Sequence, residues 1–395
     1  MEGMNLSATR IISIDAGNKD VKAVFGDLKN SLTFPNVLCP LPEKRDFIED
    51  DSGYFDAEMD GGGILNNLHF RVKSEALREL NNKIFGAGAL AARNKKGKIE
   101  VPERATKATN DQILIMYLLA AAIDAVKTHQ PDSTNTIHYK AVLSAFLPVV
   151  DVQKGLKSEF QQRLERHTHE IQFLQTPGAE NVTVRIQFVK VYTNTEGVAA
   201  VIDLAIAEPT NYHIADSTLL SKKILVSEIG GNTTEMPIVS HGKLDRYNSD
   251  GIRVGTSAYL DEIIREIESN YEHEVSSRER LVEYIKSDTH PCQIKIKGVY
   301  HSFQEISDRH LQSCATRIYE RIDRIWKNVD DLDVTLCIGG GSILLKKYLN
   351  KINQNSGKYP FLFVDDEKLV PFLNARGGWK VAYRKEEKIR KQAVV

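Results

Sequence analysis

Cysteine is scarce in this sequence of 395 residues, and the few copies lie far apart. They are Cys39, Cys292, Cys314 and Cys337, and no two of them form a C-x-x-C pair. Disulfide frameworks and zinc sites usually show closely spaced cysteines, so this pattern argues against both. We expect four free thiols in a reducing cytoplasm.

An excess of charge of either sign is also missing. The sequence has 52 lysines and arginines against 53 aspartates and glutamates, a formal net charge of -1. A nearly neutral protein has no overall field that draws it to nucleic acid or to an anionic membrane. Any contact with DNA would therefore need a local patch or an adaptor protein.

Long hydrophobic runs are absent. The longest apolar stretch, 113–125, is interrupted by Asp124 and falls short of the roughly 20 residues that span a bilayer. The first ten residues are polar and lack the basic start and apolar segment of a signal peptide. We expect 113–125 to be part of a buried helix, and we expect no direct membrane binding.

The usual constellations for metal binding and covalent catalysis do not appear either. His167 and His169 flank a threonine, but no third ligand is near and the spacing fits no zinc pattern. We interpret both as exposed histidines at a helix end. No Ser-His-Asp set and no context for a reactive cysteine is evident.

What the sequence does contain is a strand, turn and strand pattern at 224–239. The segment reads ILVSEIGGNTTEMPIV, an apolar run ending near Glu228, a Gly-Gly turn with threonines, and a second apolar run. Glycines let backbone N–H groups converge on an anion, and a carboxylate at the strand end can hold hydrated Mg²⁺. We interpret the turn as a candidate phosphate cradle; the alternative is an ordinary hairpin that binds nothing.

A similar pattern lies near the N-terminus, at 11–25. It reads IISIDAGNKDVKAVF, again an apolar strand, a carboxylate, a glycine-containing polar turn and a second strand with a lysine. Two copies of one strand–turn–strand motif suggest that the chain consists of two related halves. Such halves can hold the phosphates of one nucleotide from opposite sides.

Strands and helices alternate along the rest of the chain, which predicts an α/β or mixed-sheet architecture. The acidic stretch 43–63 and the charged tail 384–391 are expected to be solvated, and 374–378 to join the last strand to a final helix. Further strands are expected at 30–41, 65–70, 83–86, 138–149, 182–192, 293–299, 334–338 and 361–364, and helices at 105–126, 152–167, 198–207, 276–286, 303–327 and 343–350. A glycine turn capped by Thr256 or Ser257 leads into another helix that ends near 268.

Two more turns carry candidate functional residues. Glu196 lies between a strand and an alanine-rich helix. A carboxylate there can position a water molecule, or it can be an ordinary acid at a helix start, favoured by the helix dipole. The run Gly339-Gly340-Gly341-Ser342 opens a helix after a buried strand, and such a turn lets a flat ring or a phosphate approach the backbone.

In their order along the chain, these motifs resemble those of the actin and heat-shock-chaperone ATPase superfamily. Residues 15–22 are similar to its phosphate-1 motif, 196–197 to the connecting motif, 228–235 to phosphate-2 and 339–342 to the adenosine motif. Residues 83–92 and 374–377 resemble bacterial actin-like proteins of the ParM plasmid-segregation type. The matching residues are confined to short motifs, but these span nearly the whole chain.

The resemblance implies an actin-like, ribonuclease H-like α/β fold of two domains with a nucleotide cleft between them. The first domain would comprise 1–195, with an inserted subdomain at about 30–94, and would be completed by the C-terminal helix at about 375–395. The second would comprise 196–374, with an inserted subdomain at about 258–324.

The resemblance also implies how a nucleotide is held. ATP would bind with Mg²⁺, with GTP as an alternative, because no residue reads the base. Asp15 and Glu228 would hold Mg²⁺ through water, and Glu196 would orient the attacking water, so these three are the catalytic candidates. The candidates for nucleotide contact are Gly17, Asn18, Lys19, Lys22, Gly230, Gly231, Asn232, Thr233, Gly255, Ser257, Gly339, Gly340, Gly341 and Ser342. Phosphoryl transfer to water depends on positioning and charge neutralisation, which these residue types supply.

Two departures from the family pattern affect this assignment. Glu228 and Glu235 stand where phosphate-2 motifs usually have aspartate, so each carboxylate lies one methylene further out. Thr195 stands where proline usually precedes the glutamate. A shifted alignment would put Asn194 in the place of Glu196.

At the level of function, the resemblance implies filaments that assemble with ATP and are destabilised by hydrolysis. Such filaments partition plasmids or other DNA in the bacterial cytoplasm, so the partners would be other copies of the chain and a DNA-binding adaptor. Direct, sequence-specific binding to nucleic acid is not expected. One alternative is a sugar or acid kinase of the same superfamily, which would need a catalytic aspartate facing a substrate. The other is a chaperone-like nucleotide switch, which would normally need a client-binding domain.

Overall fold

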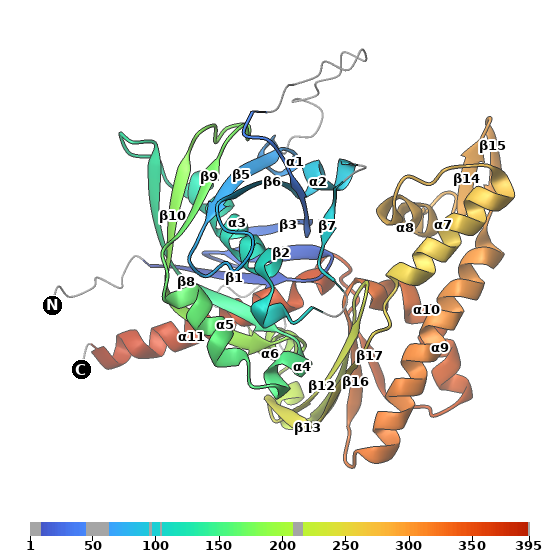
Figure 1. Cartoon of the computed structure of the whole chain (residues 1–395). Helices are drawn as coiled ribbons and strands as arrows, with labels where there is room; N and C mark the ends of the chain where they lie inside the picture. Colours follow the sequence, from blue (N-terminus) through green and yellow to red (C-terminus); the bar gives the residue numbers. More distant parts are fainter. Residues whose placement is uncertain (1–8, 45–62, 95–96, 103–104, 208–215, 394–395) are drawn as a thin grey trace. The chain divides into compact units, whose positions relative to one another are not determined.

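The computed structural model describes residues 9–44, 63–94, 97–102, 105–207 and 216–393. They divide into two compact units, Met1–Ser217 with Phe372–Val395, and Thr218–Pro371 (Figure 1). The chain thus passes into the second unit later than the expected point after residue 195. The reason is that α6 (Val198–Ala205), which follows Glu196, packs against α11 (Leu373–Ala393) within the first unit.

The first unit is built on a ten-stranded mixed sheet (Figure 1). Its middle is parallel, with β1 beside β8 and β8 beside β10, and its flanks are antiparallel. Of the strands in the expected insertion at 30–94, β5, β6 and β4 continue this same sheet beyond β9, whereas β3 pairs with β2 at the opposite edge. In order across the sheet, the strands are β3 (Ser31–Pro35), β2 (Asp20–Phe25), β1 (Arg10–Ala16), β8 (Thr136–Leu147), β10 (Thr183–Thr195), β9 (His169–Phe173), β5 (Leu68–Lys73), β6 (Lys83–Ala87), β4 (Val37–Pro40) and β7 (Ile99–Glu100).

Helix α3 (Asp111–Thr128) is the buried helix that the apolar run predicted. Asn110 accepts a hydrogen bond from the Ile113 backbone N–H at 2.9 Å and caps its first turn. Asp124, which interrupts the run, is buried and pairs with Arg10 at 2.6 Å. An internal carboxylate is tolerated here because it has a cationic partner. Among the described residues, no helix combines the length and the apolar character needed to cross a bilayer.

The C-terminal helix α11 packs on the central strands of the first unit. Its Trp379 lies in a buried cluster with Ile11 of β1 and Val142 of β8. Because side chains alternate along a strand, Ile12 and Ile14 point to the opposite face, and both are fully buried. The sheet is therefore covered on both faces at β1. The other helices of this unit are α1 (Gly63–Asn66), α2 (Ala89–Arg93), η2 (Lys107–Thr109), α4 (Val149–Gln153) and α5 (Lys157–Glu165).

The second unit has a five-stranded sheet and a separate hairpin. The sheet runs β13 (Lys243–Ile252), β12 (Thr234–Ser240), β11 (Lys223–Ile229), β16 (Val334–Ile338) and β17 (Phe361–Phe363), and the hairpin is β14 (Gln293–Ile296) with β15 (Val299–Ser302). The pairs β11–β16 and β16–β17 are parallel and the others are antiparallel.

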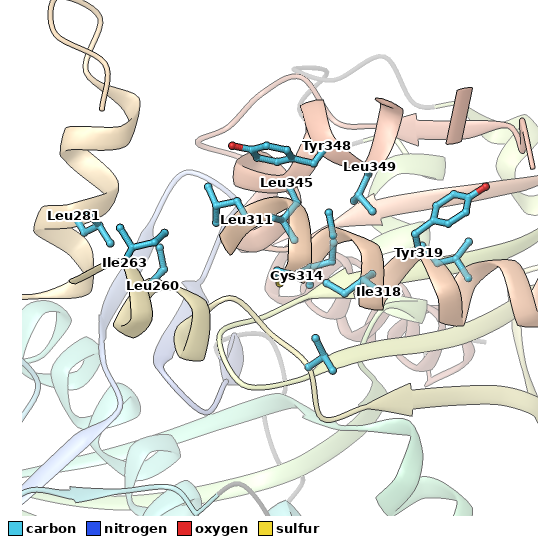
Figure 2. Close-up of a cluster of buried hydrophobic side chains, with 14 of the residues drawn as sticks. Leu260, Ile263, Leu281, Leu311, Cys314, Ile318, Tyr319, Leu345, Tyr348 and Leu349 are labelled. Carbon is cyan, nitrogen blue, oxygen red and sulfur yellow. The ribbon is translucent and has the colours of Figure 1, made fainter. Parts of the chain in front are cut away.

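The core of the second unit combines strand residues, such as Leu225 and Ile238, with side chains from the helices α7 to α10, and Figure 2 labels several of the helical side chains. Leu260 and Ile263 come from α7 (Ser257–Tyr271) and Leu281 from α8 (Arg278–Lys286). From α9 (Gln304–Asn328) and α10 (Gly340–Asn355) come Leu311, Cys314, Ile318, Tyr319, Leu345, Tyr348 and Leu349. All four cysteines of the chain are buried free thiols, as expected.

The structure corrects several expectations about local elements. Strands β9 and β13 were not predicted, and the expected helix at 152–167 is two helices, α4 and α5. Residues 374–378 lie inside α11 instead of joining it to a strand. Thr256 precedes α7, but no side-chain hydrogen bond caps that helix. Most of the acidic stretch 43–63 lies outside the described residues.

His169 is not an exposed residue at a helix end. It is a fully buried residue of β9 whose Nδ1 lies 2.7 Å from the Ser74 hydroxyl, and its Nε2 lies 3.0 Å from the Leu164 carbonyl oxygen. Burial lowers the pKa of His169 to about 4. The neutral ring serves as a hydrogen-bonded core residue, because strand pairing with β10 draws it inside. His167 is half-buried.

Candidate functional site

The predicted phosphate cradle of the second unit is the tight turn between β11 and β12. The Gly230 backbone N–H donates to the Thr233 carbonyl oxygen at 2.9 Å and closes the turn. The two acidic departures, Glu228 and Glu235, are cross-strand partners at its base. Residues 230–233 are half-buried, so solvent reaches a turn that is rich in backbone N–H groups and hydroxyls.

Gly255 brings a second segment against this turn. The backbone N–H groups of Thr256 and Ser257 donate to the carbonyl oxygens of Gly230 and Gly231 at 3.1 and 2.8 Å. A Cβ atom at Gly255 would lie only 2.3 Å from the Gly231 oxygen, so only glycine permits this approach. The predicted residues Gly255 and Ser257 thus lie beside the predicted turn.

The glycine run 339–342 meets the same hairpin from the β16 side. Glu228 and Ile338 are paired in register, so Gly339 follows directly beside the end of β11. Gly339 has φ of +82°, and a Cβ atom there would lie 2.5 Å from the Ile229 carbonyl oxygen. Ser342 is buried, and its hydroxyl donates to the Gly339 carbonyl oxygen at 2.8 Å. Its side chain therefore closes the start of α10, while Gly340 is exposed.

In the first unit, the polar turn at 17–19 connects β1 to β2. Asp15 is buried at the end of β1 and lies opposite Lys22 across the hairpin. The Gly17 N–H donates to the Asp20 carbonyl oxygen at 2.9 Å. Lys19 forms an ion pair with Glu100 at 2.8 Å, so that its ammonium is held toward β7. Asn18 is half-buried.

Asn36, which the sequence did not single out, holds this turn in shape. Its side-chain amide donates to the Gly17 carbonyl oxygen at 2.7 Å, and its backbone N–H donates to the Lys19 carbonyl oxygen at 2.7 Å. Gln112 at the start of α3 donates in turn to the Asn36 side-chain oxygen at 2.9 Å. These contacts join residues distant in sequence, so local patterns carry no signal for them.

Glu196 is a buried carboxylate of the first unit with a buried cationic partner. The Lys107 ammonium donates to Glu196 Oε1 at 2.7 Å, and the two side chains are 9% and 8% exposed. Burial raises the pKa of Glu196, Lys107 opposes that rise, and the charge of Asp15 adds to it. Lys107 was not singled out from the sequence, where it was expected to lie within a longer helix.

Asn374 ties Glu196 to Asp15. Its side-chain oxygen accepts from the Gly197 backbone N–H at 2.9 Å, directly after Glu196, and its amide donates to Asp15 Oδ2 at 3.3 Å. The amide of Asn194 instead donates to the Ser144 hydroxyl at 2.7 Å. Asn374 therefore links the backbone of Gly197, the residue directly after Glu196, to Asp15.

No three His, Cys, Asp or Glu side chains of the described residues are grouped closely enough to hold a metal ion alone. Hydrated Mg²⁺ does not require such a group, since it usually keeps several waters and binds through one or two carboxylates together with phosphate oxygens. Asp15, buried at a strand end, and Glu228, half-buried at the base of the glycine turn, are carboxylates of the kind that fit this mode.

The two units together have the actin-like fold. Residues 226–351 match the family profile described as archaeal actin homologue MreB-like, C-terminal. This range covers the hairpin turn, the Gly255 segment and the 339–342 run. Solved structures that are similar over 95–97% of the chain confirm the predicted fold class.

Within that class, the chain is similar to ParM. The Bacillus thuringiensis ParM structure with AMPPNP is 18% identical, covers 96% of this chain and 99% of its own, and gives a TM-score of 0.72. The actin-like protein Alp7A is 15% identical, with 97% of each chain covered and the same TM-score. The archaeal actin homologue Ta0583 is 16% identical, covers 95% of this chain and 100% of its own, and gives a TM-score of 0.65. No curated protein sequence matches the chain.

Proposed function

We propose that this chain is an actin-like ATPase that binds ATP with Mg²⁺, assembles into filaments of its own copies and hydrolyses the nucleotide. ATP would engage the glycine turns of both units, with GTP as an alternative. The filament would segregate plasmids or other DNA in a bacterial cytoplasm, and a DNA-binding adaptor would connect it to the DNA. Support comes from the fold and from similar ParM structures described with AMPPNP, ADP and ATP.

The observation that carries the proposal is the connection in the first unit from Asp15, through Asn374, to Gly197, the residue directly after Glu196. Hydrolysis of metal-bound ATP needs one group near the metal ion and one group that orients the attacking water. Asp15 is suited to hold hydrated Mg²⁺, and the buried carboxylate of Glu196 is suited to accept a hydrogen bond from the attacking water. Asn374 contacts Asp15 and the residue after Glu196, so it fixes the spacing between the two.

The residues of the second unit would hold the phosphates and the adenosine. Bound ATP would supply the phosphoryl group, and its Mg²⁺ would neutralise part of the phosphate charge. The backbone N–H groups near Gly230 and Gly231 would contact phosphate, as amides in glycine turns commonly do. Glu228 would hold a water of the metal. The 339–342 run would provide a surface without side chains for the adenosine.

Light scattering together with phosphate release tests the proposal. On addition of ATP and Mg²⁺, purified protein should scatter more light above a critical concentration, and phosphate should follow after a lag. ADP should not support the same assembly. Release of phosphate in the absence of any added acceptor would also separate an ATPase from a kinase. A flat scattering signal over a wide range of protein concentration, with nucleotide bound, would overturn the filament proposal.

A further inference from the structure

Lys107 and Glu196 form a buried ion pair. The packing of the fold does not by itself require a charged pair at this position. Lys107 lies in η2, a single turn before α3, and its ammonium is 2.7 Å from Glu196 Oε1. Burying a lysine costs free energy unless the charge is paired. In this protein the pair includes the carboxylate that we assign to the attacking water.

The backbone next to Lys107 is held from two sides. The Ala108 N–H donates to Asp151 Oδ2 at 3.0 Å, and the Ala108 carbonyl oxygen accepts from Arg163 Nη1 at 2.8 Å. Arg163 is itself fixed by an ion pair with Asp111 at 2.9 Å. The Lys107 side chain therefore extends from a rigid turn, which limits the positions that its ammonium and Glu196 can take.

The groups around Glu196 act on its ionisation in opposite directions, and Lys107 is the one that favours the ionised carboxylate. Burial raises its pKa, and the carboxylates of Asp15 and Asp151 raise it further. Lys107 is the group that lowers it. Tyr117 of α3 lies close enough that Asp15 and Glu196 both help to raise the pKa of its hydroxyl. An ionised carboxylate offers both of its oxygens as hydrogen-bond acceptors for an attacking water, whereas the protonated form turns one of them into a donor.

We propose that Lys107 is a positioning residue for ATP hydrolysis, which fixes the carboxylate of Glu196 toward the attacking water. The inference rests on the proposed ATPase function. Lys107 acts on the hydrolysis step through Glu196 and makes no contact with nucleotide in this role. It should therefore affect kcat and leave the KM for ATP and the assembly of filaments nearly unchanged.

A double-mutant cycle with Lys107→Met and Glu196→Gln tests this. Misplacing a catalytic group by about 1 Å can cost roughly 100-fold in rate, so Lys107→Met should lower kcat by about 10-fold to 100-fold. The double variant should be no slower than Glu196→Gln alone, because Lys107 acts only through Glu196. Lys107→Arg, which keeps the charge, should recover part of the rate. Lys140→Met, at an exposed position of β8, is the control for loss of a lysine and should match the wild type.

Three results would overturn the proposal. They are a wild-type kcat in Lys107→Met, a higher kcat in that variant, and additive losses in the double variant. Thermal unfolding of each variant separates a loss of folding from a loss of rate, and Lys107→Gln takes the place of Lys107→Met in the cycle if the latter does not fold. Absence of phosphate release in the wild type would instead refute the ATPase function, and with it this role.

Discussion

Asp203 on α6 is a buried charge whose removal should weaken the first unit strongly. Its side chain is 1% exposed and pairs with two cations of α11, Arg376 at 3.0 Å and Lys380 at 2.7 Å. Lys380 also donates to the carbonyl oxygens of Asp203 and Ile206 at 2.8 and 2.7 Å. Asp203→Asn keeps the shape but leaves two cations beside a neutral amide. Breaking a buried pair in this way costs roughly 3–5 kcal/mol.

The two tryptophans make the measurement specific to one unit. Trp379 lies on α11 in the first unit and Trp326 on α9 in the second. In a Trp326→Phe background, tryptophan fluorescence reports on the first unit alone. Asp203→Asn in that background should lower the midpoint of thermal unfolding by roughly 6–20 °C, at about 2–4 °C per kcal/mol for a unit of this size.

An exposed ion pair provides the matched control. Glu159 of the first unit pairs with Arg78 at 2.8 Å, with side chains 44% and 57% exposed. Exposed pairs contribute about 0–1 kcal/mol, so Glu159→Gln should leave the midpoint within roughly 4 °C. If Asp203→Asn shifts the midpoint no more than Glu159→Gln does, the buried network does not stabilise the attachment of α11.

Three further predictions concern the site and the core. Glu196→Ala should leave assembly intact and slow phosphate release by about 10²-fold to 10⁴-fold, the usual contribution of such a group; unchanged release would assign the water-orienting role elsewhere. Gly255→Ala should displace the Gly231 turn, because its Cβ would lie 2.3 Å from the Gly231 oxygen, and equilibrium binding should show weaker nucleotide affinity with the fold retained by circular dichroism. Because the pKa of His169 is about 4 in the fold and about 6.5 when unfolded, the unfolded chain binds the proton first, and stability should fall by up to about 3 kcal/mol as pH drops from 6.5 to 4. Urea unfolding should show less of this dependence in His169→Gln, and an equal dependence in both proteins would contradict the assignment.

Short-range patterns were sufficient for the elements that carry the candidate motifs. The two glycine-containing hairpins and the buried strand β16 with its glycine run appear where the sequence predicts them. The buried helix predicted at 105–126 is also present, but α3 begins only at Asp111. Each depends on neighbours within a few residues, such as a glycine turn between apolar runs or an asparagine cap before an apolar run. The order of these motifs was enough to indicate the actin-like fold class.

Elements whose character depends on distant partners were predicted less well. Strand β9 is short and contains a histidine, and it becomes a buried strand by pairing with β10 and β5. The alternating and exposed residues of β13 carry a weak signal, and its pairing with β12 makes it a strand. The 374–378 segment contains two glycines and looks like a turn, but packing against α6 and the central strands places it inside α11. Tertiary contacts override local propensity in all three cases.

The amino-acid sequence determined which residues are chemically suited to bind a nucleotide, because glycine, carboxylate and hydroxyl chemistry is a property of the residues and their near neighbours. The tertiary structure decided which of them act together. Lys107 lies beside Glu196, Asn374 links Gly197 to Asp15, and Asn36 holds the Gly17 turn. These contacts join segments that are far apart in the chain. They form only when the sheet and its helices are assembled, so no local pattern in the sequence could contain them.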